Sequence, residues 1–219
     1  MRKETVIHLH GFASSARSAK ARYLAERFSE FPEVRFLIPD FNPTPGDFKY
    51  LTITGMINRL RQWILDHELD TFSMIGSSMG GLVALHYAQR FGGTRRLLLL
   101  APLLSYRSLP LNGETLAGWQ KQETIEVFHY GFNEKVLLRR DFHLDALLYH
   151  EQIPPAVPIS VIHGRKDDVI PLEHSRDYAA KYPAMVAMKE VDSDHTLLDH
   201  LDFIWGQVKS MLDLPRTAK

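Results

Sequence analysis

The feature that most constrains this chain is an alternation of short apolar runs with amphipathic segments between residues 5 and 100. Four runs are predicted to be buried strands, because they are short, apolar and bounded by turn residues. Between them, apolar residues recur at helical spacing. Such alternation predicts a parallel sheet with right-handed crossovers and helices on both faces. The four predicted strands are 5–10, 34–38, 72–75 and 96–100.

The alternation breaks between residues 103 and 155, which we interpret as an insertion. The segment is rich in aromatic residues, and two apolar runs, 124–128 and 135–138, flank a turn and predict a hairpin. It follows the carboxyl end of a strand, where open α/β sheets bind ligands, so we expect it to act as a short cap. A peripheral packing element without substrate contact is the alternative.

Two further runs, 157–162 and 185–191, predict one α/β domain over residues 1–219, with a mostly parallel sheet of about six strands. Its 45% hydrophobic and 24% charged residues are ordinary for a globular protein. Lys+Arg and Asp+Glu balance at 26 each, so we expect no nucleic-acid partner. Because there is no cysteine, disulfides, thiolate metal sites and a cysteine nucleophile are excluded.

The first residues enter an apolar strand directly, without the apolar stretch of a signal peptide. No run of about 18 apolar residues predicts a membrane span. We therefore expect a cytoplasmic location and leave the oligomeric state open.

The motif Gly76-Ser77-Ser78-Met79-Gly80 stands between an apolar strand and a predicted helix. A serine on a very tight strand-to-helix turn is strained, and glycines two residues before and after it relieve the crowding. This context is typical of a nucleophile elbow and predicts Ser78 as a nucleophile. The alternative is a small-residue turn before a buried helix. Ser77 has no assigned role.

A serine hydroxyl needs a base to take its proton and an acid to orient the base. His195 follows the last predicted strand, and two adjacent carboxylates, Asp167 and Asp168, follow the strand before it. The chain order serine, aspartate, histidine is that of α/β-hydrolases rather than of chymotrypsin or subtilisin.

Three motifs together carry a family resemblance: His10-Gly11-Phe12, the serine motif, and His163-Gly-x-x-Asp167-x-x-Ile170-Pro171 with Asp194-His195. On these motifs the chain resembles the α/β-hydrolase superfamily over nearly its whole length. The stretch 10–20 also looks like that of small bacterial esterases and related thioesterases, which lack the early antiparallel strands of larger members. The family pattern selects Asp167 over Asp168.

The resemblance implies a serine hydrolase of carboxylic esters or thioesters that forms an acyl-enzyme and needs no cofactor. The backbone N–H groups of Phe12 and Met79 would form the oxyanion hole, each typically worth about 3–4 kcal/mol. Among the cap aromatics, Trp119, Phe128 and Tyr130 are candidates for substrate contact, and structural packing explains them equally well. A ligand-binding or non-hydrolytic member of the same fold with little ester turnover is the alternative.

Other polar clusters have weaker functional interpretations. The pair His8 and His10 lacks the acidic continuation of a binuclear metal site, and the carboxylates around His195 suit a solvated helix start. We therefore predict no metal. Arg17 and Lys20 could hold an anionic substrate group at a helix start, or could form a solvated face.

Overall fold

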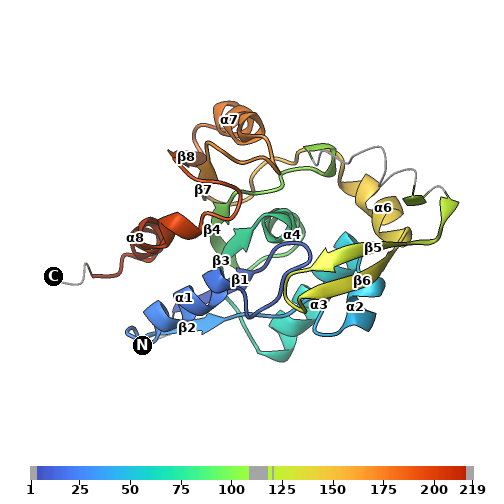
Figure 1. Cartoon of the computed structure of the whole chain (residues 1–219). Helices are drawn as coiled ribbons and strands as arrows, with labels where there is room; N and C mark the ends of the chain where they lie inside the picture. Colours follow the sequence, from blue (N-terminus) through green and yellow to red (C-terminus); the bar gives the residue numbers. More distant parts are fainter. Residues whose placement is uncertain (1–3, 109–117, 120, 216–219) are drawn as a thin grey trace.

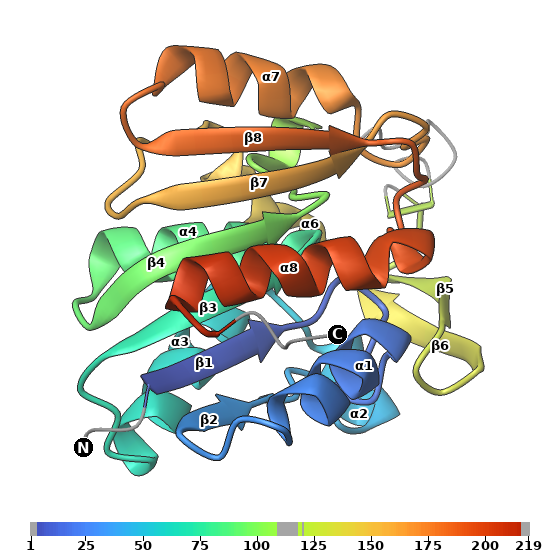
Figure 2. The same cartoon turned by 90° about the vertical axis from the view of Figure 1, so that its left-hand side faces the viewer.

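A six-stranded parallel sheet forms the centre of the molecule (Figures 1 and 2). The computed structural model describes residues 4–108, 118–119 and 121–215. The strand order is β2-β1-β3-β4-β7-β8, and each neighbouring pair is parallel. The predicted parallel sheet of about six strands is confirmed. Its strands are β1 (Glu4–Leu9), β2 (Val34–Leu37), β3 (Phe72–Ser77), β4 (Thr94–Leu100), β7 (Ile159–Gly164) and β8 (Val186–Val191).

Helices cover both faces of this sheet, as the alternation predicted (Figures 1 and 2). Successive side chains of a strand point to opposite faces, so Val6 and Ile75 pack on one side while Ile7 and Met74 pack on the other. The first face carries α1 (Ala19–Phe28) and α8 (Leu201–Leu212), and the second carries α3 (Ile53–Asp66), α4 (Met79–Arg90) and α7 (Leu172–Lys181).

Helix α4 lies in the middle of the second layer, between the sheet and the insertion (Figure 1). Residues 79–87 are all buried, including the small Gly80, Gly81 and Ala84. A helix that is apolar and small on every side is typical of a buried position. The start of α4, which follows Ser78, is therefore anchored in the core.

Two helices between β1 and β3 begin at capping side chains. Helix α1 begins after Ser18, whose side chain accepts a hydrogen bond from Ala21 N–H at 3.3 Å. The loop after β2 leads into a short helix, α2 (Pro45–Lys49). Thr44 and Asp47 form a reciprocal capping box there, and Pro45 occupies the first turn, where its missing N–H costs nothing.

The insertion between β4 and β7 contains the predicted hairpin, which lies beside α2 and α6 on the α4 side of the sheet (Figure 1). A two-stranded hairpin needs packing to be stable, and here Val136 and Leu138 are buried against the core. A short helix and a 3-10 turn follow the hairpin over residues 141–149. The elements of the insertion are η1 (Tyr106–Ser108), β5 (Thr124–His129), β6 (Glu134–Arg139), α6 (Asp141–Ala146) and η2 (Leu147–Tyr149).

Among the residues that the structure describes, no helix has the length and apolarity needed to cross a membrane. The cytoplasmic location stays a prediction. A last 3-10 turn, η3 (Leu198–His200), joins the loop after β8 to α8.

Candidate active site

Ser78 occupies a strained turn between β3 and α4. Its φ of 50° and ψ of −117° are unusual for a residue with a side chain, and its N–H donates to Leu100 O at 2.9 Å. A Cβ atom on Gly76 would lie 2.7 Å from Gly80 O, and one on Gly80 would overlap Leu9 O. Both positions therefore admit only glycine, and the turn holds the Ser78 side chain at the carboxyl end of the sheet.

The structure brings Ser78, His195 and Asp167 into one hydrogen-bonded chain. His195 Nε2 lies 3.1 Å from Ser78 Oγ, and His195 Nδ1 lies 2.8 Å from Asp167 Oδ2. The three residues follow β3, β8 and β7, whose carboxyl ends meet at one edge of the sheet. This is the arrangement in which a histidine can take a proton from a serine hydroxyl while a carboxylate orients its ring.

Asp167 is the carboxylate partner of His195 among the described residues, whereas the adjacent Asp168 is exposed. The Asp167 side chain is fully buried, and its Oδ1 accepts the N–H groups of Val169 and Ile170 at 2.9 and 2.8 Å. The structure thus separates two neighbouring carboxylates that the chain order alone left open.

His163 is a second partner of Asp167 to which sequence reasoning assigned no role. Its Nε2 lies 3.0 Å from Asp167 Oδ2, and its Nδ1 lies 2.8 Å from the Ser175 hydroxyl. Burial raises the pKa of Asp167, but hydrogen bonds from His163 and His195 outweigh it and hold the pKa well below its usual range. Asp167 is therefore ionised at neutral pH and able to orient His195.

The two N–H groups expected to bind an oxyanion lie on either side of the serine. In the described part of the chain, neither Phe12 N–H nor Met79 N–H donates a hydrogen bond. Met79 opens α4, whose first-turn N–H groups have no partner within the helix and carry the positive end of its dipole. The loop before Phe12 is close to Ser78, since a Cβ atom on Gly11 would lie 3.3 Å from Ser78 Cβ.

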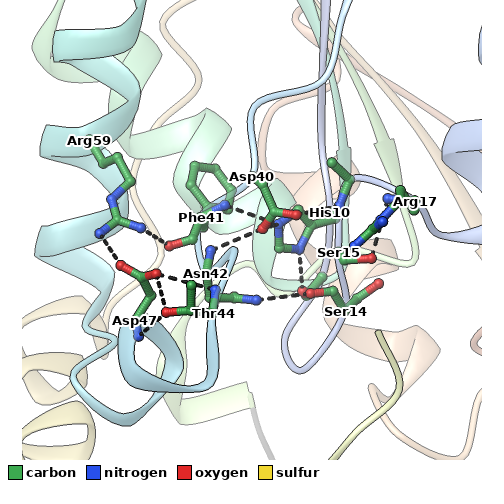
Figure 3. Close-up of polar contacts among 12 residues, drawn as sticks. His10, Ser14, Ser15, Arg17, Asp40, Phe41, Asn42, Thr44, Asp47 and Arg59 are labelled. Carbon is green, nitrogen blue, oxygen red and sulfur yellow. Dashed lines mark hydrogen bonds and ion pairs between the residues drawn. The ribbon is translucent and has the colours of Figure 1, made fainter. Parts of the chain in front are cut away.

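A polar network holds the loop that carries Phe12 (Figure 3). His10 Nδ1 lies 2.9 Å from Gly11 O, and His10 Nε2 accepts the N–H of Phe41 at 3.2 Å. Asp40 accepts the N–H groups of Ala16 and Asn42, both at 3.0 Å. These contacts join the loop after β1 to the loop after β2, which fixes the position of the Phe12 backbone.

The same loop is also tied to the insertion. The Asn42 amide donates to Ser14 O at 3.1 Å and lies 3.0 Å from His129 Nε2 (Figure 3 labels Asn42 and Ser14). Tyr130 N–H, at the tip of the hairpin, donates to Ala13 O at 2.8 Å. The hairpin and the loop after β1 therefore form one connected wall.

The surroundings of Asp40 predict that the free energy of unfolding depends on pH. Burial raises the pKa of Asp40, but the contact with His10, whose Nε2 lies 3.3 Å from Asp40 Oδ1, and the hydrogen bond from Ala16 N–H outweigh it and bring the pKa down from 3.8 to about 2. A depressed carboxylate pKa stabilises the fold above pH 3.8, and this contribution is lost as the pH falls toward 2. We expect Asp40→Asn to lower the free energy of unfolding by about 1–2 kcal/mol at pH 7 and by much less at pH 2.

Urea unfolding of wild type and variant at both pH values measures this difference. The exposed Asp66→Asn is the matched control, for which we expect a change below about 0.5 kcal/mol at either pH. An equal loss for Asp40→Asn at pH 7 and pH 2 would show that the charge of Asp40 contributes nothing.

Ser78 opens onto a cavity of about 770 Å³, which is within the usual range for small-molecule sites. On the insertion side its wall is apolar, formed by Leu103, Trp119, Val127, Leu138 and Phe142. Trp119 is buried, whereas Phe128 and Tyr130 are exposed and pack edge to face, with ring centroids 5.3 Å apart. All three aromatic residues predicted from the sequence line this cavity.

A family model matches residues 5–212, nearly the whole chain. The chain belongs to the uncharacterised protein family UPF0227. Solved structures with a similar fold include a candidate hydrolase from Agrobacterium vitis S4, with a TM-score of 0.77 and 21% identity over 95% of this chain and 88% of that one. Together with the sheet order and the position of the elbow, these similarities show that the chain has the α/β-hydrolase fold.

Two further neighbours of the same fold come from distant organisms. Est1E from Butyrivibrio proteoclasticus, solved with ferulic acid bound, has a TM-score of 0.74 and 19% identity over 95% of this chain and 88% of its own. Mouse alpha/beta hydrolase domain-containing protein 10 has a TM-score of 0.73 and 17% identity, over 95% of this chain and 89% of its own.

The histidines and carboxylates of this UPF0227 chain that were weighed as metal ligands do not form a group in the described structure. Among the residues described, no three His, Asp or Glu side chains are grouped as a metal ion would require. His10 is engaged with Gly11 and Phe41, while His8 lies on the α1 face of the sheet near Phe36. Arg17 is exposed and outside the cavity, whereas Lys20 lines it.

Proposed function

We propose that this chain is a serine hydrolase that cleaves carboxylic ester or thioester bonds through an acyl-enzyme. The observation that carries the proposal is the hydrogen-bonded chain from Ser78 through His195 to Asp167, with distances of 3.1 and 2.8 Å. It lies at the wall of a cavity and beside two N–H groups that donate to no acceptor among the described residues. Nucleophile, base, orienting acid and oxyanion donors are the four parts that acyl transfer needs.

In the first half of the reaction, Ser78 Oγ attacks the carbonyl carbon of the substrate, and His195 Nε2 takes the hydroxyl proton. The N–H groups of Phe12 and Met79 donate to the oxygen that becomes negative, and the ionised Asp167 stabilises the protonated His195. When the tetrahedral intermediate collapses, His195 gives the proton to the leaving alcohol or thiol. The acyl group remains on Ser78.

In the second half, water takes the place of the leaving group. His195 removes a proton from the water, which attacks the acyl carbonyl, and the same two N–H groups bind the second oxyanion. Proton return from His195 to Ser78 Oγ releases the carboxylic acid and restores the enzyme. No metal or cofactor is needed for either half.

We further propose that the segment 103–155 acts as a cap and that its apolar wall binds the hydrocarbon part of the substrate. Trp119 and Phe142 supply flat apolar surface, and their rings lie 6.3 Å apart. Phe128 and Tyr130 are exposed at the hairpin, where a substrate could reach them on entry. Such a wall suits an apolar acyl or aryl group.

A fluorophosphonate probe tests the nucleophile. We expect the folded protein to be labelled on Ser78, because the probe reacts with a serine hydroxyl that a neighbouring base activates. Peptide mapping by mass spectrometry identifies the residue. Urea-unfolded protein is the control and should not be labelled. Folded protein without a label on Ser78 would contradict the assignment of Ser78 as the nucleophile.

The reaction class is tested separately with p-nitrophenyl butyrate and S-phenyl thiobutyrate. Turnover of either compound by wild type supports the hydrolase. Labelling of Ser78 without turnover of any ester or thioester would favour the ligand-binding or non-hydrolytic alternative.

A further inference from the structure

The cavity has a second, polar side opposite its apolar wall. We call it the α1 subsite and define it by five of the residues that line the cavity: His8, Ser18, Lys20, Ser77 and Thr196. They come from β1, the start of α1, the end of β3 and the loop after His195. Ser78 lies between the α1 subsite and the apolar wall formed by the insertion.

Two buried polar side chains of the α1 subsite have no partner. Within the described part of the protein, the two ring nitrogens of His8 and the hydroxyl of Ser77 make no hydrogen bond. His8 pairs in register with Ile75, so Ser77, two residues further on, points to the same face of the sheet. A buried polar group without a partner is costly, so these groups suit a bound molecule that supplies one.

His8 contributes a neutral donor and acceptor. Burial first, and then the nearby charges of Lys20 and His10, lower its pKa to about 3. The ring is therefore uncharged at neutral pH and carries one N–H donor and one free nitrogen. Together with the Ser77 hydroxyl, it offers hydrogen bonds without adding charge.

Lys20 supplies the positive charge of the α1 subsite. Its ammonium group has three donors, and one of them bonds to Thr196 O at 2.7 Å. Burial lowers its pKa to about 8, and the charges of Asp194 and Asp167 oppose that shift, so it remains mostly protonated at pH 7. The group thus has further donors for a ligand while it is held beside the His195 loop.

The start of α1 adds backbone donors at the same place. Ser18 caps the ten-residue helix by accepting Ala21 N–H. In the described structure no backbone carbonyl accepts the N–H groups of Ala19 or Lys20, which belong to the first turn. These groups and the helix dipole favour a negative ligand.

The charges of the residues that line the cavity favour a ligand with a single negative charge. Lys20 is the one Lys or Arg side chain that lines the described cavity, and Glu126, Asp168 and Asp194 are carboxylates that also line it. Asp194 is engaged with the N–H and hydroxyl of Thr196, at 2.8 and 2.6 Å. A dianion such as phosphate would face these carboxylates with only one cation to balance it, whereas a carboxylate needs no more than one.

From this juxtaposition we propose that the α1 subsite binds a carboxylate group of the substrate, with Lys20 as its cation and His8 and Ser77 as hydrogen-bonding partners. The inference rests on the proposed function, since it makes the substrate an ester or thioester with an apolar group on the insertion side of Ser78. The carboxylate then lies on the α1 side.

Matched substrates test the inference. One pair is p-nitrophenyl hydrogen adipate and p-nitrophenyl hexanoate, which differ by a carboxylate on the acyl half. The other is p-carboxyphenyl butyrate and its methyl ester, which differ on the leaving group. For at least one pair, we expect Lys20→Met to lower kcat/KM for the charged ester about tenfold or more beyond its effect on the neutral one.

Arg17→Met is the matched control, because Arg17 is exposed, precedes Lys20 by three residues and lies outside the cavity. In both substrate pairs, it should leave the ratio of kcat/KM for the charged ester to kcat/KM for the neutral ester unchanged. Equal losses for charged and neutral esters in both pairs with Lys20→Met would mean that Lys20 only holds Thr196, and would overturn the inference. Should Lys20→Met fail to fold, Ser77→Ala is read in the same way, since it removes a hydroxyl that has no partner among the residues the structure describes.

A binding measurement separates the subsite from the reaction. We expect glutarate to raise the Tm of Ser78→Ala and to lose this effect in Ser78→Ala/Lys20→Met. Inorganic phosphate should raise the Tm little, and an equal effect of phosphate would overturn the carboxylate assignment. Glutarate binding that depends on Lys20, without any ester turnover by wild type, would keep the subsite and reject the proposed hydrolase. Ester turnover without such binding would support the proposed hydrolase and reject the subsite.

Discussion

Replacing Ser78 with alanine is expected to lower kcat for ester hydrolysis by about 10⁴-fold or more. The side chain is small and buried in part, so its removal leaves the strained turn in place but takes away the hydroxyl that we propose as the nucleophile. In serine hydrolases with a comparable hydrogen-bonded triad, loss of the nucleophile costs about this much or more. Initial rates with p-nitrophenyl butyrate measure the change.

Ser29→Ala is the control for this measurement, because Ser29 is exposed at the far end of α1. It should leave kcat unchanged within about twofold. A small residual rate in Ser78→Ala is expected from the oxyanion donors alone. If Ser78→Ala and wild type turned over the ester at equal rates, the activity would come from another site.

The second large effect is expected at Asp167. An asparagine there can still accept the N–H groups of Val169 and Ile170, but it lacks the charge that stabilises protonated His195. Its amide can also donate to His195 Nδ1 and so favour the wrong tautomer. We expect Asp167→Asn to lower kcat on the order of 10⁴-fold with little change in KM.

Asp168→Asn is the matched control, since it makes the same change one residue away on an exposed side chain. It should alter kcat by less than about threefold. Thermal unfolding of both variants shows whether each is folded at the assay temperature. A large loss in Asp168→Asn with little effect in Asp167→Asn would reverse the assignment of the acid.

The arrangement of elements was predictable because each element carries its own signal. The strands of the parallel sheet are short apolar runs, and the helices show a 3.6-residue period, so both can be recognised locally. Where the signal depends on polar side chains, the sequence is ambiguous. Ser14-Ser15 and Ser18 are all plausible caps, and only the path of the loop after β1 selects Ser18.

The sequence by itself determined the parallel α/β fold and the chain order of Ser78, Asp167 and His195. Both depend on patterns within a few residues and on the rule that strand ends meet at one edge of the sheet. The family pattern already pointed to Asp167 rather than Asp168. Tertiary structure alone decided that His163 is a second partner of Asp167, and that Lys20 faces the cavity and reaches Thr196. The local sequence around a residue does not show which way its side chain points or which distant residue it contacts, because packing decides both.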